Sequence, residues 1–238
     1  MSMRSPIRRH SHPWEIATLV FQVIIVMAIT SLAGCVTPVA VKDQLPKLDY
    51  TNNETVLISV IDERGRVKRG KPEDFIGVAH GVFGIPADWH VGQVLATEEG
   101  DEDRDLSDWL EYRIVNGLNK EGWQSRALDL NSLPDIDEAE SRLIEEDASW
   151  LIALVLNEWY FSINLNWVTA FNFDTDANLH VFHIGGGKVL SKSFIGRDVI
   201  EEKGSESPQN NILGAYRAQL QQIFNDEALQ NALENKGD

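Results

Sequence analysis

The side chain best suited to covalent chemistry is the thiol of Cys35, the one cysteine in a chain of 238 residues. A single cysteine cannot form an internal disulfide, and a structural zinc site generally needs four ligands. Cys35 directly follows two small residues, Ala33 and Gly34, at the end of an apolar segment. Its position therefore indicates a role near the N-terminus and not in a disulfide or metal framework.

The segment before Cys35 has the layout of an export signal. Arg4, Arg8 and Arg9 precede a stretch from Ile16 to Gly34 that carries no charged residue. We expect the arginines to stay at the anionic cytoplasmic face of a membrane while the apolar stretch enters the hydrocarbon. The stretch is also close to the length of about 20 residues that spans a bilayer as a permanent helix, so an uncleaved anchor is the alternative.

The residues Leu32 to Cys35 read L-A-G-C, which resembles the lipobox of bacterial lipoproteins. The resemblance implies that diacylglycerol is attached to the Cys35 thiol, that cleavage between Gly34 and Cys35 removes residues 1–34, and that the new amino terminus is acylated. Val36 stands where an Asp retains enterobacterial lipoproteins at the inner membrane. The resemblance therefore implies an outer-membrane location, facing the periplasm. Two or three acyl chains hold a protein on a bilayer without a basic patch.

A basic run stands out in this acidic chain, whose formal net charge is -16. Such blocks of charge are often interaction segments, so we predict that the run contacts an anionic envelope partner, either an acidic protein face or a lipopolysaccharide phosphate. The alternative is a loop kept soluble by its charges. Nucleic acid is an unfavourable partner, because like charges repel and no counterions would be released. The predicted contact residues are Arg64, Arg66, Lys68, Arg69 and Lys71.

Two histidines could carry chemistry in the segment that follows. His80 and His90 lie in and just after a glycine-rich stretch, where a loop could present a ligand or a base. The sequence lacks the metalloprotease motif H-E-x-x-H and the hydrolase motif G-x-S-x-G. We therefore predict a non-enzymatic binding or assembly role, with no catalytic residues and no cofactor. The alternatives are an exported enzyme with its active site in residues 77–105 and an auxiliary lipoprotein of an envelope transport system.

The acidic run from Glu98 to Asp105 contains alternating aspartates, as a calcium loop does. Leu106 occupies the position where an EF-hand loop needs its turn glycine. We therefore predict a solvated acidic loop and no specific metal site. Weak divalent-ion binding is the alternative.

The chain divides into a signal peptide over 1–34, an acylated cysteine with a tether over 35–54, and one periplasmic globular domain over 55–238. The tether is predicted because Pro38 and Pro46 stand in a polar segment without periodicity. The rest of the chain is long enough to bury a core without disulfides or metal.

The sequence of residues 55–238 predicts an α/β fold with a mixed sheet. Residues 55–62 (TVLISVID) and 150–156 (WLIALVL) are nearly continuous apolar runs, typical of strands covered on both faces. Between them we expect an irregular segment over 63–105, helices over 106–121 and 135–148, and a strand over 123–128. This order of strands and helices favours parallel pairs.

The sequence after residue 156 predicts a different arrangement of strands, an antiparallel meander. Alternation indicates strands over 165–173, 178–184 and 188–195, the last two joined by glycines. One long helix then covers the sheet, with Ser207 as its N-cap and Pro208 in its first position. An α+β fold is the alternative for the whole domain.

These features also resemble, in part, small envelope lipoproteins of the YajG type. The resemblance lies in scaffold residues and implies a surface lipoprotein with an interaction role, and it brings no catalytic residues. The matching features are Asp62-Glu63-Arg64, the GVFGIP segment over 81–86, Glu158-Trp159, Gly187-Lys188-Val189 and the long last helix.

Overall fold

The computed structural model describes residues 37–81, 84–164, 170–201 and 207–234. The chain divides into two units, Met1–Thr37 and Pro38–Asp238, and every helix and strand named below belongs to the second. Gly34 and Cys35, the predicted cleavage and acylation residues, lie outside the described residues. Part of the strand predicted over 165–173 also lies outside them.

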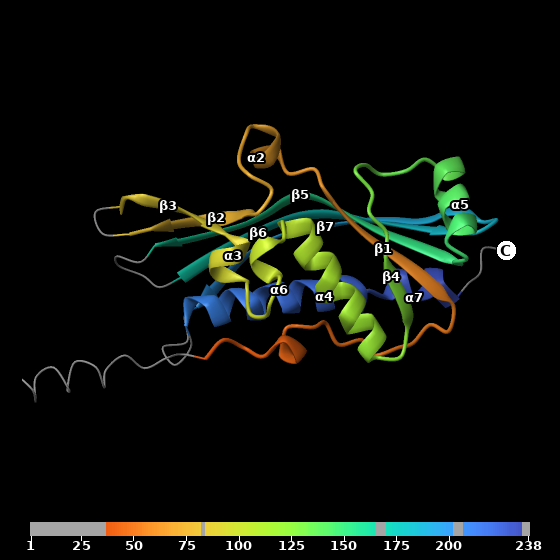
Figure 1. Ribbon diagram of the computed structural model, residues 1–238, viewed down its shortest axis with the longest axis horizontal. Helices are drawn as coiled ribbons and strands as arrows, with labels where there is room; N and C mark the ends of the chain where they lie inside the picture. Colours follow the sequence, from red (N-terminus) through yellow and green to blue (C-terminus); the bar gives the residue numbers. More distant parts are fainter. Residues whose placement is uncertain (1–36, 82–83, 165–169, 202–206, 235–238) are drawn as a thin grey trace, which may run out of the picture. The chain divides into compact units, whose positions relative to one another are not determined.

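One mixed sheet of seven strands forms the centre of this unit (Figure 1). β1 lies between β4 and β5 and runs parallel to both, as the order of elements predicts. β2 is also parallel to β5 and pairs with its second half, and β3 is antiparallel to β2. β6 and β7 follow as antiparallel strands from β5. The strands are β1 (Thr55–Asp62), β2 (Phe75–His80), β3 (Pro86–His90), β4 (Gln124–Ala127), β5 (Trp150–Asn164), β6 (Ala170–His183) and β7 (Gly187–Glu201).

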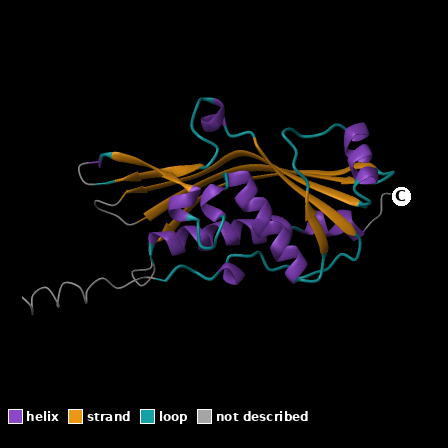
Figure 2. Ribbon diagram, in the orientation of Figure 1, coloured by secondary structure: helices purple, strands orange, loops and turns teal. Residues whose placement is uncertain are grey.

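Helices cover both faces of the sheet, which confirms the predicted α/β class (Figure 2). On one face, Ile114 of α4 and Tyr216 of α6 share a buried cluster with Ile58 of β1. On the other face, Leu143 of α5 packs with Leu57 of β1. The helices are α2 (Gly65–Lys68), α3 (Val91–Val94), α4 (Leu106–Lys120), α5 (Ile136–Glu145), α6 (Pro208–Phe224) and α7 (Glu227–Glu234), with short 3-10 turns η1 (Val41–Asp43) and η3 (Asp101–Asp103).

Capping side chains start the helices where the sequence predicts. Asp105, Asp135 and Ser207 each accept the backbone N–H of the residue three positions later. The predicted long C-terminal helix is present as α6, but it ends at Phe224, and Asp226 starts a second helix, α7, by accepting the N–H of Ala228 over 3.0 Å.

β5 and β6 are longer than the sequence indicates. The polar residue Asn157 interrupts the apolar run of β5, but the register shifts by a bulge between Leu156 and Glu158 and the strand continues to Asn164. β6 runs without a break through Asp174 and Asp176, where a turn between two predicted strands was expected. Those polar residues alternate with buried ones, so the pattern is that of one strand with one covered face.

The prediction that 63–105 is irregular is also wrong. The segment holds α2, the β2–β3 hairpin, α3 and η3. Gly77 lets β2 lie close to β5, since a Cβ there would come within 2.3 Å of the Phe161 carbonyl oxygen. Pro86 begins β3, an outer strand of the sheet, where its missing N–H costs no ladder hydrogen bond.

Residues 38–54 are not the free tether that the sequence predicts. Leu45 and Leu48 are each 7% exposed, and Leu48 joins the main core cluster. Pro46 packs so closely on α4 that a Cβ on Gly117 would meet its ring at 2.7 Å. The folded body therefore begins at about Pro38, and not at residue 55.

Candidate functional site

Arg64, the first residue of the predicted basic contact, is only 2% exposed. Its Nε and Nη2 donate to the carboxylate of Asp62 over 2.8 and 2.7 Å. Nη1 donates to the carbonyl of Phe75 over 2.6 Å, and Nη2 also donates to the carbonyl of Glu73 over 2.8 Å. The prediction that Arg64 contacts a partner is therefore wrong, because this side chain ties the end of β1 to the start of β2.

The next cations of the run meet acids of the same chain. Arg66 lies over the Tyr160 ring, 3.7 Å from its centroid, and its Nε donates to Glu158 over 3.1 Å. Burial raises the pKa of Tyr160, while the Arg66 guanidinium opposes that rise. Lys68 pairs with Glu63.

Few cations of the basic run are both exposed and unburdened by close packing, as the side-chain exposures show. Lys71 pairs with Asp88, and both are partly exposed. Lys68 keeps 60% of its side chain exposed, and Arg69 is exposed as well. The predicted five-residue contact is thereby reduced to Lys68 and Arg69 as its most accessible cations, beside the partly covered Arg66 and Lys71. Contact with a partner stays a prediction for these four.

The structure does not bring His80 and His90 together. In the β2–β3 hairpin, His80 pairs with Pro86 and His90 pairs with Phe75, at opposite ends of the ladder. His90 Nδ1 lies 3.0 Å from Asp74 Oδ1. The two imidazoles therefore cannot act on one substrate atom in this arrangement.

The acidic run folds inward onto one arginine of α4. Asp101 is fully buried, and its Oδ2 accepts Arg113 Nη2 over 2.6 Å and the Thr97 N–H over 3.0 Å. Glu98 accepts Arg113 Nη1 over 3.0 Å, and Gln44 accepts its Nε over 3.0 Å. The loop is therefore built around a buried ion pair, and not solvated throughout as predicted. Within the described part of the chain, no group of three or more His, Cys, Asp or Glu side chains could hold a metal ion.

The sequence analysis missed Arg113. The residue sits four positions after Trp109, on the apolar side of α4, where an arginine is unusual. A cation on an apolar helix face needs a buried partner, and that rule would have pointed to the preceding acidic run.

It also missed Glu111, whose carboxylate accepts the N–H of Val60 over 3.2 Å. β4 pairs with β1 only up to Ile58, so Glu111 covers a β1 edge that no strand covers. Desolvation by burial raises the pKa of Glu111 to about 7; the Val60 hydrogen bond opposes the rise, and Asp108 adds to it. Glu111 can therefore change its charge near neutral pH.

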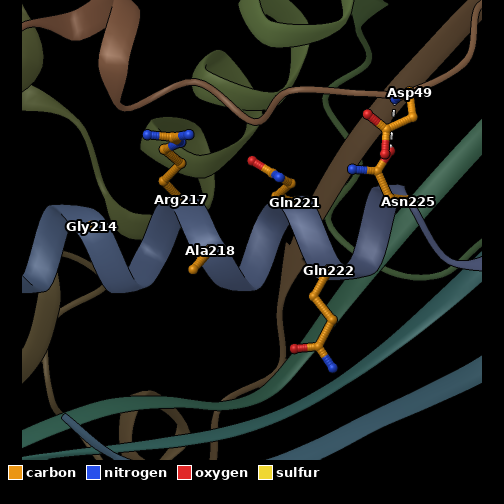
Figure 3. A pocket seen from close by; sticks show the side chains of 7 residues that line it. All are labelled: Asp49, Gly214, Arg217, Ala218, Gln221, Gln222 and Asn225. Atoms are coloured by element: carbon orange, nitrogen blue, oxygen red, sulfur yellow. Dashed lines mark hydrogen bonds between the residues drawn. The ribbon is translucent and has the colours of Figure 1, made fainter.

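A hollow of about 590 Å³ lies along the exposed side of α6 (Figure 3). Arg217 and Gln221 lie on the side of the helix that faces the N-terminal segment, and Gln222 points toward the sheet. Asn225 accepts the N–H of Asp49 over 3.1 Å and thereby holds that segment beside the helix. Amide and charged side chains line the hollow and offer hydrogen bonds to a polar molecule. The lining residues are Asp49, Gly214, Arg217, Ala218, Gln221, Gln222 and Asn225.

No family model matches the sequence, and no curated protein matches it. Among solved structures, protein XCC0632 from Xanthomonas campestris, whose family model is DUF330, is similar at 10% identity over 81% of this chain and 94% of that chain, with a TM-score of 0.47. Hypothetical protein CT253 from Chlamydia trachomatis is similar at 8% identity over 77% and 100% of the two chains, with a TM-score of 0.43. Lipoprotein GNA1162 from Neisseria meningitidis is similar at 12% identity over 73% and 99%, with a TM-score of 0.28. Likenesses this distant do not establish a family or a shared function.

Proposed function

We propose that this chain is a bacterial lipoprotein, anchored through lipid on Cys35, whose domain has a non-enzymatic binding role in the cell envelope. The observation that carries the proposal is the sequence L-A-G-C at the end of an apolar stretch preceded by three arginines. Among the described residues, no helix is long and apolar enough to cross a membrane. Acyl chains on Cys35 would hold the protein on a bilayer.

The start of the folded body supports the same proposal. The Val39 N–H donates to Asn210 Oδ1 over 2.9 Å, so the chain is already fixed at the N-terminal end of α6. Pro38 comes three residues after Cys35 in the sequence, and three extended residues span at most about 11 Å. Cleavage before Cys35 would leave the whole folded body intact, with its lipid attachment close to it.

We place the protein at the outer membrane, facing the periplasm, because Val36 follows the cysteine where an Asp would retain it at the inner membrane. In that position the exposed cations Lys68 and Arg69 of the α2 region contact an anionic component of the envelope. The large excess of acidic residues keeps the acidic parts of the surface away from anionic lipid.

Labelling with a radioactive fatty acid tests the anchor. Cells that express the full chain should yield a labelled protein, and the Cys35→Ser variant should yield none. A Cys35→Ser protein that still takes up label would contradict acylation of this thiol.

Crosslinking in intact cells tests the binding role. A photoreactive residue at Arg69 should yield an adduct with an envelope component, whereas one at Arg142, on the exposed side of α5, should not. Addition of a Lys68→Glu change should reduce the adduct. If position 69 gave no adduct, or the same adducts as position 142, the proposed contact would be wrong.

A further inference from the structure

Several features that suit contact with a membrane lie at one end of the sheet. His80, at the end of β2, pairs with Pro86 of β3 and with Asn164 at the end of β5. At the same end, Ala170 at the start of β6 pairs with Glu201 at the end of β7. The last residues of β2, β5 and β7 and the first residues of β3 and β6 therefore lie at one end of the sheet, and α5 lies toward the other (Figure 1).

The chain also enters the fold at this end. α6 begins at Pro208, soon after β7 ends, and its first turn holds Val39 through Asn210. From Cys35 to Val39 an extended chain covers at most about 14 Å. Chain length therefore limits how far from Val39 a lipid on Cys35 can be attached.

The described residues just before and at the start of β3 are exposed and carry no charge. Ile85 is 65% exposed, and Gly84, Pro86 and Ala87 beside it are exposed too. The sequence from 75 to 87 contains no Asp, Glu, Lys or Arg, although 24% of the chain is charged. An exposed isoleucine in an uncharged turn enters the headgroup region of a bilayer at little electrostatic cost.

Other exposed apolar side chains have charged neighbours: Ile195 is 77% exposed and Val199 61%, and Arg197 and Asp198 stand between them in β7. The connection from β7 to α6 contains Glu201, Glu202 and Glu206 in its sequence, which anionic headgroups repel. Ile144 on α5 is 63% exposed, almost as much as Ile85, but Arg142 and Glu145 stand beside it and α5 lies toward the other end. Exposure alone therefore does not distinguish Ile85, whereas its uncharged surroundings and its position near the chain entry do.

We infer that Ile85, immediately before β3, rests with its exposed neighbours Gly84, Pro86 and Ala87 in the lipid headgroup layer of the membrane that holds the anchor. This inference rests on the proposed acylation of Cys35. The contact gives the domain a second point of attachment and so fixes its orientation on the bilayer. The opposite end, with α5, then faces away from the lipid.

The natural chain has one cysteine, which makes the test specific. The full-length acylated protein is purified as Ile85→Cys or, as the matched control, Ile144→Cys, and the new thiol is labelled with an environment-sensitive dye. Both sites are exposed, so equal urea midpoints for the two variants and the unchanged protein serve as the folding check. The proteins are reconstituted in vesicles of phosphatidylethanolamine and phosphatidylglycerol that contain nitroxide-labelled lipid.

Contact with the headgroup layer predicts a blue-shifted emission for the dye at position 85, with quenching by the nitroxide lipid about threefold stronger than at position 144. Equal emission and quenching at the two positions would overturn the hairpin contact and leave the anchor in place. The unchanged protein should not take up the dye, because its thiol is acylated. Dye uptake by the unchanged protein would overturn the proposed anchor, and the hairpin contact with it.

Discussion

Arg113 Nη2 donates to Asp101 Oδ2 over 2.6 Å, and both side chains are fully buried. The pair joins α4 to the loop that follows α3, and Gln44 of the N-terminal segment donates to Thr97 of the same loop over 2.7 Å. A buried charge that loses its partner is costly, so this contact makes the acidic loop and the N-terminal segment parts of one folded body.

The first prediction concerns that ion pair. Asp101→Asn keeps the volume of the side chain but leaves the partly exposed Glu98 as the carboxylate that pairs with the buried Arg113, so we expect the free energy of unfolding to fall by about 3 kcal/mol. Asp103→Asn, at an exposed position of the same loop, should change it by less than about 0.5 kcal/mol. Urea denaturation of both variants measures the difference, and equal midpoints would contradict the structural role of Asp101.

The second prediction concerns residues 38–54. Leu48→Ala should lower the free energy of unfolding by about 2–4 kcal/mol, because it leaves a cavity in the main core. Lys47→Ala is the matched control, since the Lys47 side chain is exposed and only its carbonyl accepts a hydrogen bond, from Asn225. Thermal unfolding of the two variants is the measurement. If Leu48→Ala unfolded at the same temperature as Lys47→Ala, residues 38–54 would be a tether after all.

The third prediction concerns pH. In the folded protein, burial raises the pKa of Glu111 to about 7 from its ordinary value of 4.5, so the folded state binds a proton more tightly than the unfolded state does. Stability from this group is present below pH 4.5 and is lost as the pH rises through about 7.

Glu111→Gln removes the titration and keeps an oxygen that can accept the Val60 N–H. At pH 8 the variant should be more stable than the unchanged protein by about 1–2 kcal/mol, once partial solvation of the side chain is allowed for. The two should converge at pH 4.5. Denaturant unfolding across this range is the measurement, and the exposed Glu102→Gln should show no such trend. A stability difference that did not change with pH would contradict the assignment.

The fourth prediction concerns Arg64. Its guanidinium makes hydrogen bonds to one carboxylate and two carbonyls, a geometry that the single ammonium of lysine cannot reproduce. Arg64→Lys should therefore destabilise the protein by about 2 kcal/mol, while Arg69→Lys should have no measurable effect. Equal urea midpoints for the two variants would contradict the structural role of Arg64.

The sequence pattern predicted correctly those helices and strands that depend on residues close together in the chain. The unbroken apolar run of β1 and the capping aspartates of α4 and α5 are signals of this kind. β2 was missed because its place beside β5 depends on Gly77 approaching the Phe161 carbonyl, a contact between residues distant in the sequence. The strand predicted over 150–156 was too short because two adjacent polar residues at a bulge, Asn157 and Glu158, look like the end of a strand.

In the candidate site, too, some features could be predicted from the local sequence and others depend on contacts that only the fold provides. The basic run was visible as composition, but the burial of Arg64 depends on Asp62 and on carbonyls that the fold brings around it. The charge of Glu111 likewise depends on a strand edge that β4 leaves uncovered. Cys35, in contrast, is predicted from a motif of four adjacent residues and needs no fold to be recognised.

Mass spectrometry of the native protein extracted from membranes tests the central claim most directly. We expect a chain that begins at Cys35, with a glyceride on its sulfur and acyl chains that survive mild alkali only where they are amide-linked. A chain that begins at Met1 and carries an unmodified thiol at Cys35 would contradict it.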